Sequence, residues 1–75
     1  MINSLLTEIK NEYESASLKY PAFHSTHEGY AVLKEEVDEL WDGVKDNEGI
    51  MGNEALRKEA IQIAAMALRF IEDLC

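Results

Sequence analysis

Residues 60–71 read AIQIAAMALRFI, and this stretch decides the fold. Only Gln62 and Arg69 are polar in it, so a helix formed here is apolar on nearly every face and needs cover on nearly every face. A chain of 75 residues with three helices could hardly supply that cover. The stretch therefore predicts an interface with an identical chain, and the alternative is a compact monomer with a central helix. Small side chains would allow a partner helix to approach closely at Ala60, Ala64, Ala65 and Ala67.

Two helices are predicted on the amino-terminal side of this stretch. The first covers about residues 3–17, where apolar side chains recur every three or four positions. It ends before Pro21, because the residue before a proline avoids the helical conformation. The second follows a capping-box pattern, in which the Ser25 hydroxyl and the Glu28 carboxylate satisfy free amides at the helix start. Its apolar side chains continue at helical spacing through Lys45.

The third predicted helix contains the apolar stretch. A turn-rich segment at residues 46–52 precedes it, and Asn53 is a suitable N-cap. The helix then runs from Glu54 to about Leu74. The sequence thus predicts a single all-α domain over residues 1–75, a helical bundle whose core is completed by oligomerisation.

The amino-acid composition argues against some classes of function. The net charge is −8, from 15 acidic and 7 basic residues, and such a chain repels nucleic acid and anionic membranes. The apolar stretch is too short to span a bilayer, and Met1–Ser4 has neither a basic region nor an apolar core. A cytoplasmic protein is therefore expected. The lone cysteine, Cys75, excludes a disulfide within the chain.

Acidic side chains border the apolar stripes of two helices. Glu36 and Glu39 are three residues apart and lie on one helical face, and Glu59 and Gln62 repeat this spacing in the third helix. Antiparallel packing through the stripes would bring the two pairs together. Carboxylates packed so closely repel one another, and a hard cation with oxygen ligands, such as Mg²⁺, relieves the repulsion. The alternative interpretation is that these glutamates only form solvated helix faces.

The same residues resemble a family signature. Glu35-Glu36-x-x-Glu39, followed after 19 residues by Glu59-x-x-Gln62, is similar to the EExxE…ExxD signature of the all-α nucleoside triphosphate pyrophosphohydrolases, the MazG-like proteins. The resemblance covers roughly residues 24–74. Members of that family use Mg²⁺ to cleave a nucleoside triphosphate between the α- and β-phosphates. They form dimers, or dimers of dimers, around a four-helix core.

This resemblance implies roles for single residues. Glu36, Glu39 and Glu59 would be metal ligands, and Glu35 would orient or deprotonate the attacking water. Gln62 replaces the final aspartate of the signature, so it offers an oxygen to the metal but no charge. The implied function is a Mg²⁺-dependent pyrophosphohydrolase that converts a ribo- or deoxyribonucleoside triphosphate into the monophosphate and pyrophosphate. The alternative is a non-catalytic, MazG-like binding or regulatory module, which the glutamine motivates.

Three further residues are candidates for substrate binding. Arg69 shares a stripe with Gln62 on an otherwise apolar helix and is a candidate for phosphate contacts. Lys58 is another candidate, although a solvated or ion-paired role is the simpler interpretation of this lysine. Trp41 could stack on a base, although ordinary packing is the simpler interpretation. The expected partners are a nucleoside triphosphate and identical chains, as a homodimer or homotetramer, without nucleic acid or membrane.

Overall fold

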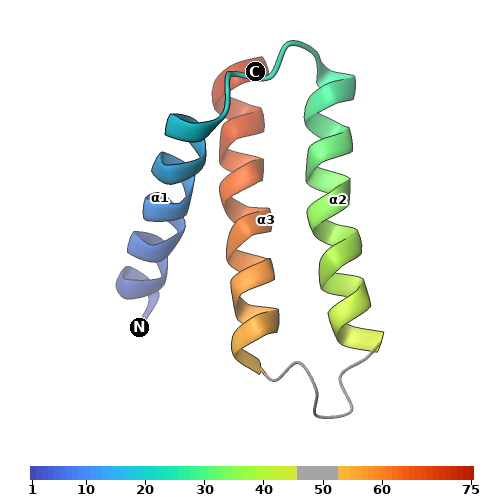
Figure 1. Ribbon diagram of the computed structural model, residues 1–75. Helices are drawn as coiled ribbons and strands as arrows, with labels where there is room; N and C mark the ends of the chain where they lie inside the picture. The colour runs from blue at the N-terminus through green and yellow to red at the C-terminus, as the bar shows by residue number, and fades with distance from the viewer. Residues whose placement is uncertain (46–52) are drawn as a thin grey trace.

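The computed structural model describes residues 1–45 and 53–75, which form three α-helices (Figure 1). The helices are α1 (Ile2–Lys19), α2 (Thr26–Lys45) and α3 (Asn53–Leu74). The predicted bounds agree with these to within two residues, and the all-α fold class is confirmed. The predicted turn at residues 46–52 lies outside the described residues. No helix in the described part of the chain is long and apolar enough to cross a membrane.

The three helices form one layer with α3 in the middle (Figure 1). Both α1 and α2 pack against α3, and within these described helices they do not contact each other. The molecule measures 38 × 28 × 19 Å, so its thinnest dimension is not far above the 10–12 Å diameter of one helix. Such a layer covers α3 on two sides and leaves two broad faces.

The connection between α1 and α2 crosses the carboxyl end of α3 and is bonded to it. Tyr20 has extended backbone angles, as expected before Pro21, and it ends α1. The Arg69 guanidinium donates a hydrogen bond of 2.8 Å to the carbonyl of Pro21. The backbone N–H of Phe23 donates to the carboxylate of Asp73 at 3.1 Å. These bonds place the connection over α3 and so fix where α1 and α2 lie.

The predicted capping box at the start of α2 is confirmed. The backbone N–H of Glu28 donates to the Ser25 hydroxyl oxygen at 3.1 Å. In return the Glu28 carboxylate accepts a hydrogen bond of 2.7 Å from the backbone N–H of His24. Two amides at the helix start are satisfied in this way.

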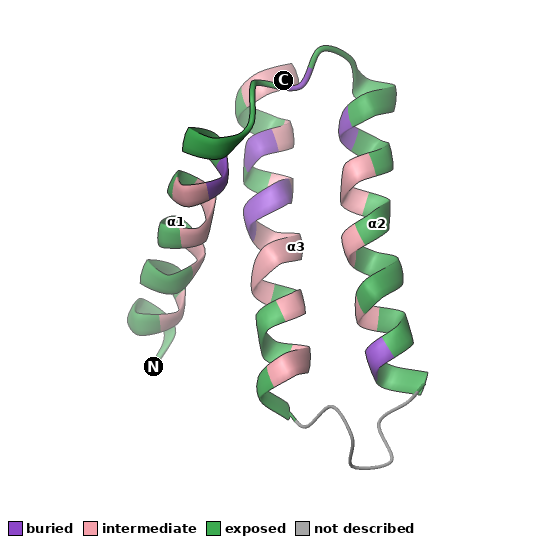
Figure 2. Ribbon diagram, in the orientation of Figure 1, coloured by how far each residue is buried: buried purple, intermediate pink, exposed green. Residues whose placement is uncertain are grey.

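The core within one chain is small (Figure 2). The buried apolar residues are Ala16, Phe23, Ala65 and Met66. Among the described residues no large side chain is fully buried. Ala65 was predicted to face a partner helix; instead it is fully buried inside the chain, since it lies on the side of α3 that packs against the other helices. Ala60, on another side of the helix, is exposed.

Gly29 allows α2 to approach α3 closely. A Cβ atom at this position would lie 2.7 Å from the Phe70 ring and 2.8 Å from a methyl group of Leu74. We expect Gly29→Ala to destabilise the protein by about 1 kcal/mol, because an overpacking cost of about 1–3 kcal/mol exceeds the gain of about 1 kcal/mol in helix propensity. Denaturant unfolding measures this change. Ala31→Gly, on the exposed side of the same helix, calibrates the propensity contribution alone.

Candidate metal centre

Three carboxylates from two helices meet between α2 and α3. Glu36 and Glu39 lie on one face of α2, and Glu59 lies on α3, which runs antiparallel beside it (Figure 1). One oxygen atom of each residue lies within 4.8 Å of those of the other two. The antiparallel packing expected from the sequence has therefore brought these three side chains together.

The cluster is electrostatically unfavourable in the isolated chain. Burial raises the pKa of Glu36, and the neighbouring charges of Glu39 and Glu59 raise it further. Burial also raises the pKa of Glu59, with the Glu39 carboxyl as the next largest cause. The Oε2 atoms of Glu36 and Glu59 are buried and have no hydrogen-bond partner. Buried acceptors without a donor are costly, so these two oxygens call for a positively charged partner.

A hard divalent cation fits this donor set. In an octahedral site with oxygen ligands at about 2.0–2.1 Å from Mg²⁺, adjacent ligands are about 2.9 Å apart and opposite ligands about 4.2 Å apart. The three oxygens lie within 4.8 Å of one another, so a side-chain rotation that brings them closer would place them around one ion. Glu39 is exposed and free to make it, whereas Glu36 and Glu59 are partly buried. The residues could thus bind Mg²⁺ with water or a phosphate completing its coordination.

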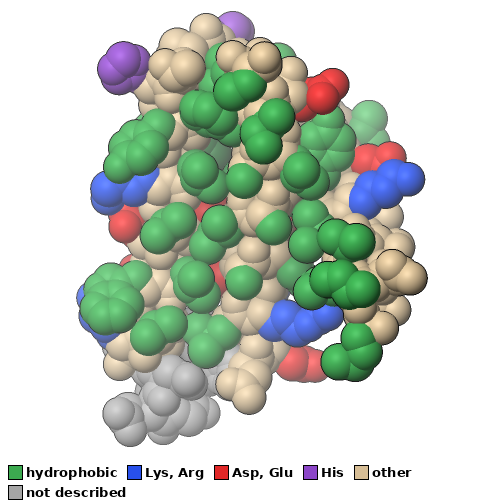
Figure 3. Space-filling view, turned by 180° about the vertical axis from the view of Figure 1, so that it is seen from behind, with side chains coloured by type: hydrophobic (Ala, Val, Ile, Leu, Met, Phe, Trp, Pro, Cys, Tyr) green, Lys and Arg blue, Asp and Glu red, His purple; other side chains and the backbone are tan. Residues whose placement is uncertain are grey.

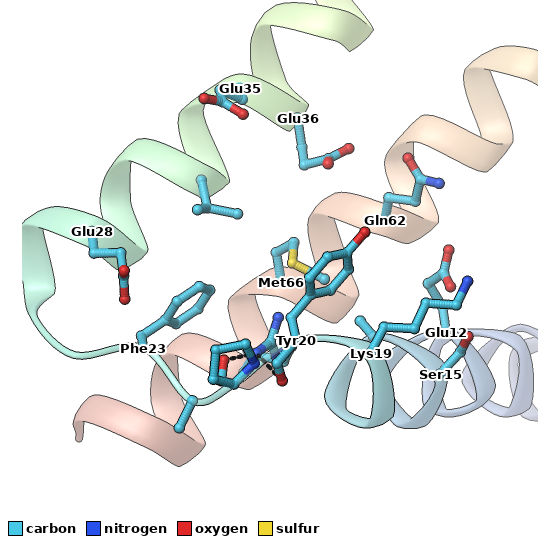
Figure 4. A pocket seen from close by; sticks show the side chains of 15 residues that line it. Glu12, Ser15, Lys19, Tyr20, Phe23, Glu28, Glu35, Glu36, Gln62 and Met66 are labelled. Atoms are coloured by element: carbon cyan, nitrogen blue, oxygen red, sulfur yellow. Dashed lines mark hydrogen bonds between the residues drawn. The ribbon is translucent and has the colours of Figure 1, made fainter.

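A cavity of about 450 Å³ opens beside the cluster (Figure 4). Residues from all three helices and from the α1–α2 connection line it. Glu36 of α2 and Gln62 of α3 point toward each other across one end. The other end contains the apolar side chains of Phe23 and Met66, with the Glu28 carboxylate near Phe23. One end therefore offers carboxylate and amide oxygens, while the other offers a surface for an apolar or aromatic group.

Of the remaining predicted site residues, some line this cavity and others lie outside it. Glu35 and Gln62 line the cavity beside Glu36, and Arg69 lies at its apolar end, tied to backbone carbonyls of the connection. Lys58 is exposed and lines a second, more open hollow between α1 and α3. Trp41 is 57% exposed, with the Lys45 ammonium 5.8 Å from its ring centre, and does not line the cavity. Neither Lys58 nor Trp41 lines the cavity beside the carboxylate cluster.

Two charged residues of α1 that the sequence did not predict as site residues also line this cavity. Glu12 lines the cavity, and its charge contributes to the raised pKa of Glu36. Lys19 lines the same cavity and is exposed there. Neither residue stands in a recognisable motif. Only the packing of α1 against α3 brings them near the cluster, and the pattern of α1 alone does not specify that packing.

The raised pKa values predict how pH affects stability. Between pH 4.5 and the raised pKa values of Glu36 and Glu59, the folded protein holds more protons than the unfolded chain. In EDTA the contribution of these groups to stability should therefore be largest at low pH and be lost as pH rises through that window. Thermal unfolding in EDTA should show a melting temperature that falls as the pH rises from 4.5 through the raised pKa values, and that rises again on addition of Mg²⁺. Glu59→Gln should show a flatter pH profile and a smaller response to the ion; an unchanged profile would contradict the assignment.

The chain matches no protein family model, no curated protein and no solved structure. The similarity to the MazG-like signature thus depends on the motif residues alone.

Proposed function

We propose that the protein is a Mg²⁺-dependent nucleoside triphosphate pyrophosphohydrolase that acts as a homodimer or homotetramer. The observation that supports this most directly is the cluster of Glu36, Glu39 and Glu59, with two buried carboxylate oxygens that lack a partner. Carboxylates at this spacing suit a hard cation, and phosphate groups commonly complete its coordination. The adjoining cavity, with an apolar end, is of a size that small-molecule sites have.

The proposed reaction adds water to the α-phosphorus of the nucleotide. The bond from that phosphorus to the oxygen bridging to the β-phosphate breaks, so that pyrophosphate leaves and a nucleoside monophosphate remains. The bound cation would neutralise phosphate charge. Glu36, Glu39 and Glu59 would hold it, and Glu35, at the same end of the cavity, would accept a proton from the attacking water.

The charge of the cavity explains why a cation is required. The chain carries −8, and Glu12, Glu35 and Glu36 all line the cavity. A nucleoside triphosphate is itself an anion and would be repelled by these groups alone. Lys19 is an exposed cation at the rim, and the Arg69 guanidinium is already bonded to backbone carbonyls. A bridging metal therefore has to supply most of the attraction for phosphate.

The function is tested by measuring pyrophosphate release from a panel of ribo- and deoxyribonucleoside triphosphates, with Mg²⁺ and with EDTA. Metal-dependent release of pyrophosphate and the monophosphate is expected for at least one substrate. Release of single phosphates would instead indicate a different bond cleavage. No release from any substrate, by a protein shown to be folded, would remove the proposal.

Gln62 favours one alternative, a binding module that has lost catalysis. It lines the cavity opposite Glu36, at the position where the resembled signature has an aspartate, and contributes no charge. On this alternative the protein binds Mg²⁺ and nucleotide in calorimetry but releases no pyrophosphate. Gln62→Asp is then expected to create turnover in the same assay.

A further inference from the structure

Tyr20 is an exposed aromatic side chain that lines the cavity beside the carboxylate cluster. Three aromatic side chains of the described residues are more than half exposed, namely Tyr20 at 61%, Tyr30 at 62% and Trp41 at 57%. Of these three, only Tyr20 lines the cavity. Exposure alone indicates no ligand, since hydrophobic side chains cover much of the molecular face shown in Figure 3. Tyr20 differs because its ring is exposed at a cavity that a small molecule could enter.

The backbone of Tyr20 is held in place although its side chain is exposed. Its N–H donates a hydrogen bond of 3.0 Å to the carbonyl of Ala16. The Arg69 guanidinium donates to the Tyr20 carbonyl at 3.5 Å and to the Pro21 carbonyl at 2.8 Å. Pro21 also restricts Tyr20 to the extended conformation that it has. None of these interactions involves the phenol ring, so the ring is a pre-positioned surface that a ligand can use without ordering the backbone first.

The ring lies close enough to the carboxylates for one molecule to reach both. Gln62, Met66 and Arg69 line the cavity along one side of α3, and Arg69 contacts the Tyr20 backbone. Figure 4 shows the Tyr20 ring extending from the connection into the cavity, with its hydroxyl on the side of Gln62. Gln62 and Arg69 are separated by about 10 Å, at a rise of about 1.5 Å per residue. In a nucleotide one ribose separates the α-phosphate from the base, so a phosphate near Glu36 and a base at Tyr20 can belong to the same molecule.

The surroundings of the ring suit an uncharged aromatic group better than a phosphate. Phe23 and Met66 are buried and supply an apolar wall to this part of the cavity. The Glu28 carboxylate lies near Phe23 and would repel a phosphate, whereas it would not repel an uncharged base. Each nucleobase has a π-face that can stack on a tyrosine ring. The base is therefore the part of a nucleotide that fits at Tyr20.

We propose that Tyr20 is the residue on which the base of the substrate stacks, so that the protein binds nucleotides in preference to inorganic polyphosphates. This rests on the proposed function, because the base is that of the nucleoside triphosphate held through the cation. It moves base stacking from Trp41, the candidate of the sequence, to the tyrosine that ends α1. Stacking does not read the hydrogen-bonding edge of a base, so purine and pyrimidine nucleotides should both depend on Tyr20.

Calorimetry with Mg²⁺ and the α,β-methylene analogue of ATP measures nucleotide binding without cleavage. Tyr20→Ala should weaken binding about tenfold or more, which is in the range for the loss of one stacked base. Tyr20→Phe keeps the ring and should keep most of the affinity. Tyr30→Ala is the matched control, because Tyr30 is equally exposed and does not line the cavity. Inorganic tripolyphosphate has no base, so it should bind equally to both alanine variants. Equal affinity of the two alanine variants for the analogue, or no binding of the analogue by the natural chain, would overturn the proposal.

NMR of the natural chain tests the same contact without a substitution. Addition of Mg²⁺ and the analogue should shift the ring-proton signals of Tyr20 upfield, because a stacked base places its ring current over them, and should leave those of Tyr30 in place. Unshifted Tyr20 signals at saturation would overturn the proposal even if Tyr20→Ala does not fold.

The pyrophosphate assay separates this proposal from the proposed function. Binding of the analogue that depends on Tyr20, without pyrophosphate release from any nucleoside triphosphate, contradicts the enzymatic function and supports the role of Tyr20. Pyrophosphate release with the same KM in Tyr20→Ala and Tyr30→Ala supports the enzymatic function and contradicts the role of Tyr20.

Discussion

Glu39→Gln should reduce the rate of pyrophosphate release by about a hundredfold or more, since loss even of groups that only support metal ligands costs 10–100-fold. Glu39 is the exposed member of the cluster, so its substitution disturbs little packing. Removing its charge also reduces the electrostatic repulsion on Glu36 and Glu59, whose pKa values Glu39 raises. In EDTA the variant should therefore be at least as stable as the natural protein. Calorimetry with Mg²⁺ should show a matching loss of affinity.

Asp38→Asn is the matched control for this prediction. Asp38 is the neighbouring residue of α2, and its carboxylate pairs with Lys34 at 2.9 Å, away from the cluster. Asp38→Asn removes the same charge from the same helix, at a solvent-exposed ion pair that contributes little to stability. Full activity in the control with loss in Glu39→Gln assigns the effect to the cluster. Equal activity in both variants would show that the three carboxylates do not carry the reaction.

The sequence predicts the elements of this fold well because their signals are local. Pro21 and the capping box of Ser25 and Glu28 mark helix ends through chemistry within a few residues. The sequence also predicted that Glu36 and Glu39 would lie close to Glu59. Helical spacing places each of these residues near an apolar stripe, and a short connection between two helices favours antiparallel packing. These features depend on one helix or on two adjacent helices.

Features that depend on tertiary packing were predicted poorly. The sequence does not distinguish Ala65 from the other alanines of its helix. Ala65 is buried and Ala60 is exposed because of where α1 and α2 pack against α3. Glu12 was not a candidate, because its approach to Glu36 depends on how α1 packs against α3. Trp41 is on the helix that carries the motif, but it is exposed and does not line the cavity, which its place in the sequence does not indicate. The spacing of residues along the sequence does not determine these contacts between helices.

Arg69→Ala should destabilise the protein by about 2–3 kcal/mol, or about 10 °C or more in melting temperature for a domain of this size. Arg69 is buried, at 4% exposure, and its guanidinium donates to the carbonyl of Pro21 and stacks 4.7 Å from the Phe23 ring centre. Alanine removes the donor and the cation–π contact, and it leaves a void beneath the connection. The connection would then be held mainly by the bond from Phe23 to Asp73.

Arg57→Ala is the control, because it removes the same residue type from the same helix. Arg57 makes a bidentate pair with Glu8, but both side chains are about half exposed, and solvent screens such pairs strongly. Thermal unfolding at one protein concentration should thus show a large loss for Arg69→Ala and a small one for Arg57→Ala. If the two losses are equal, Arg69 does not anchor the connection. A role limited to substrate phosphate would then be the better explanation, and it would appear as a raised KM with no larger loss of melting temperature than Arg57→Ala shows.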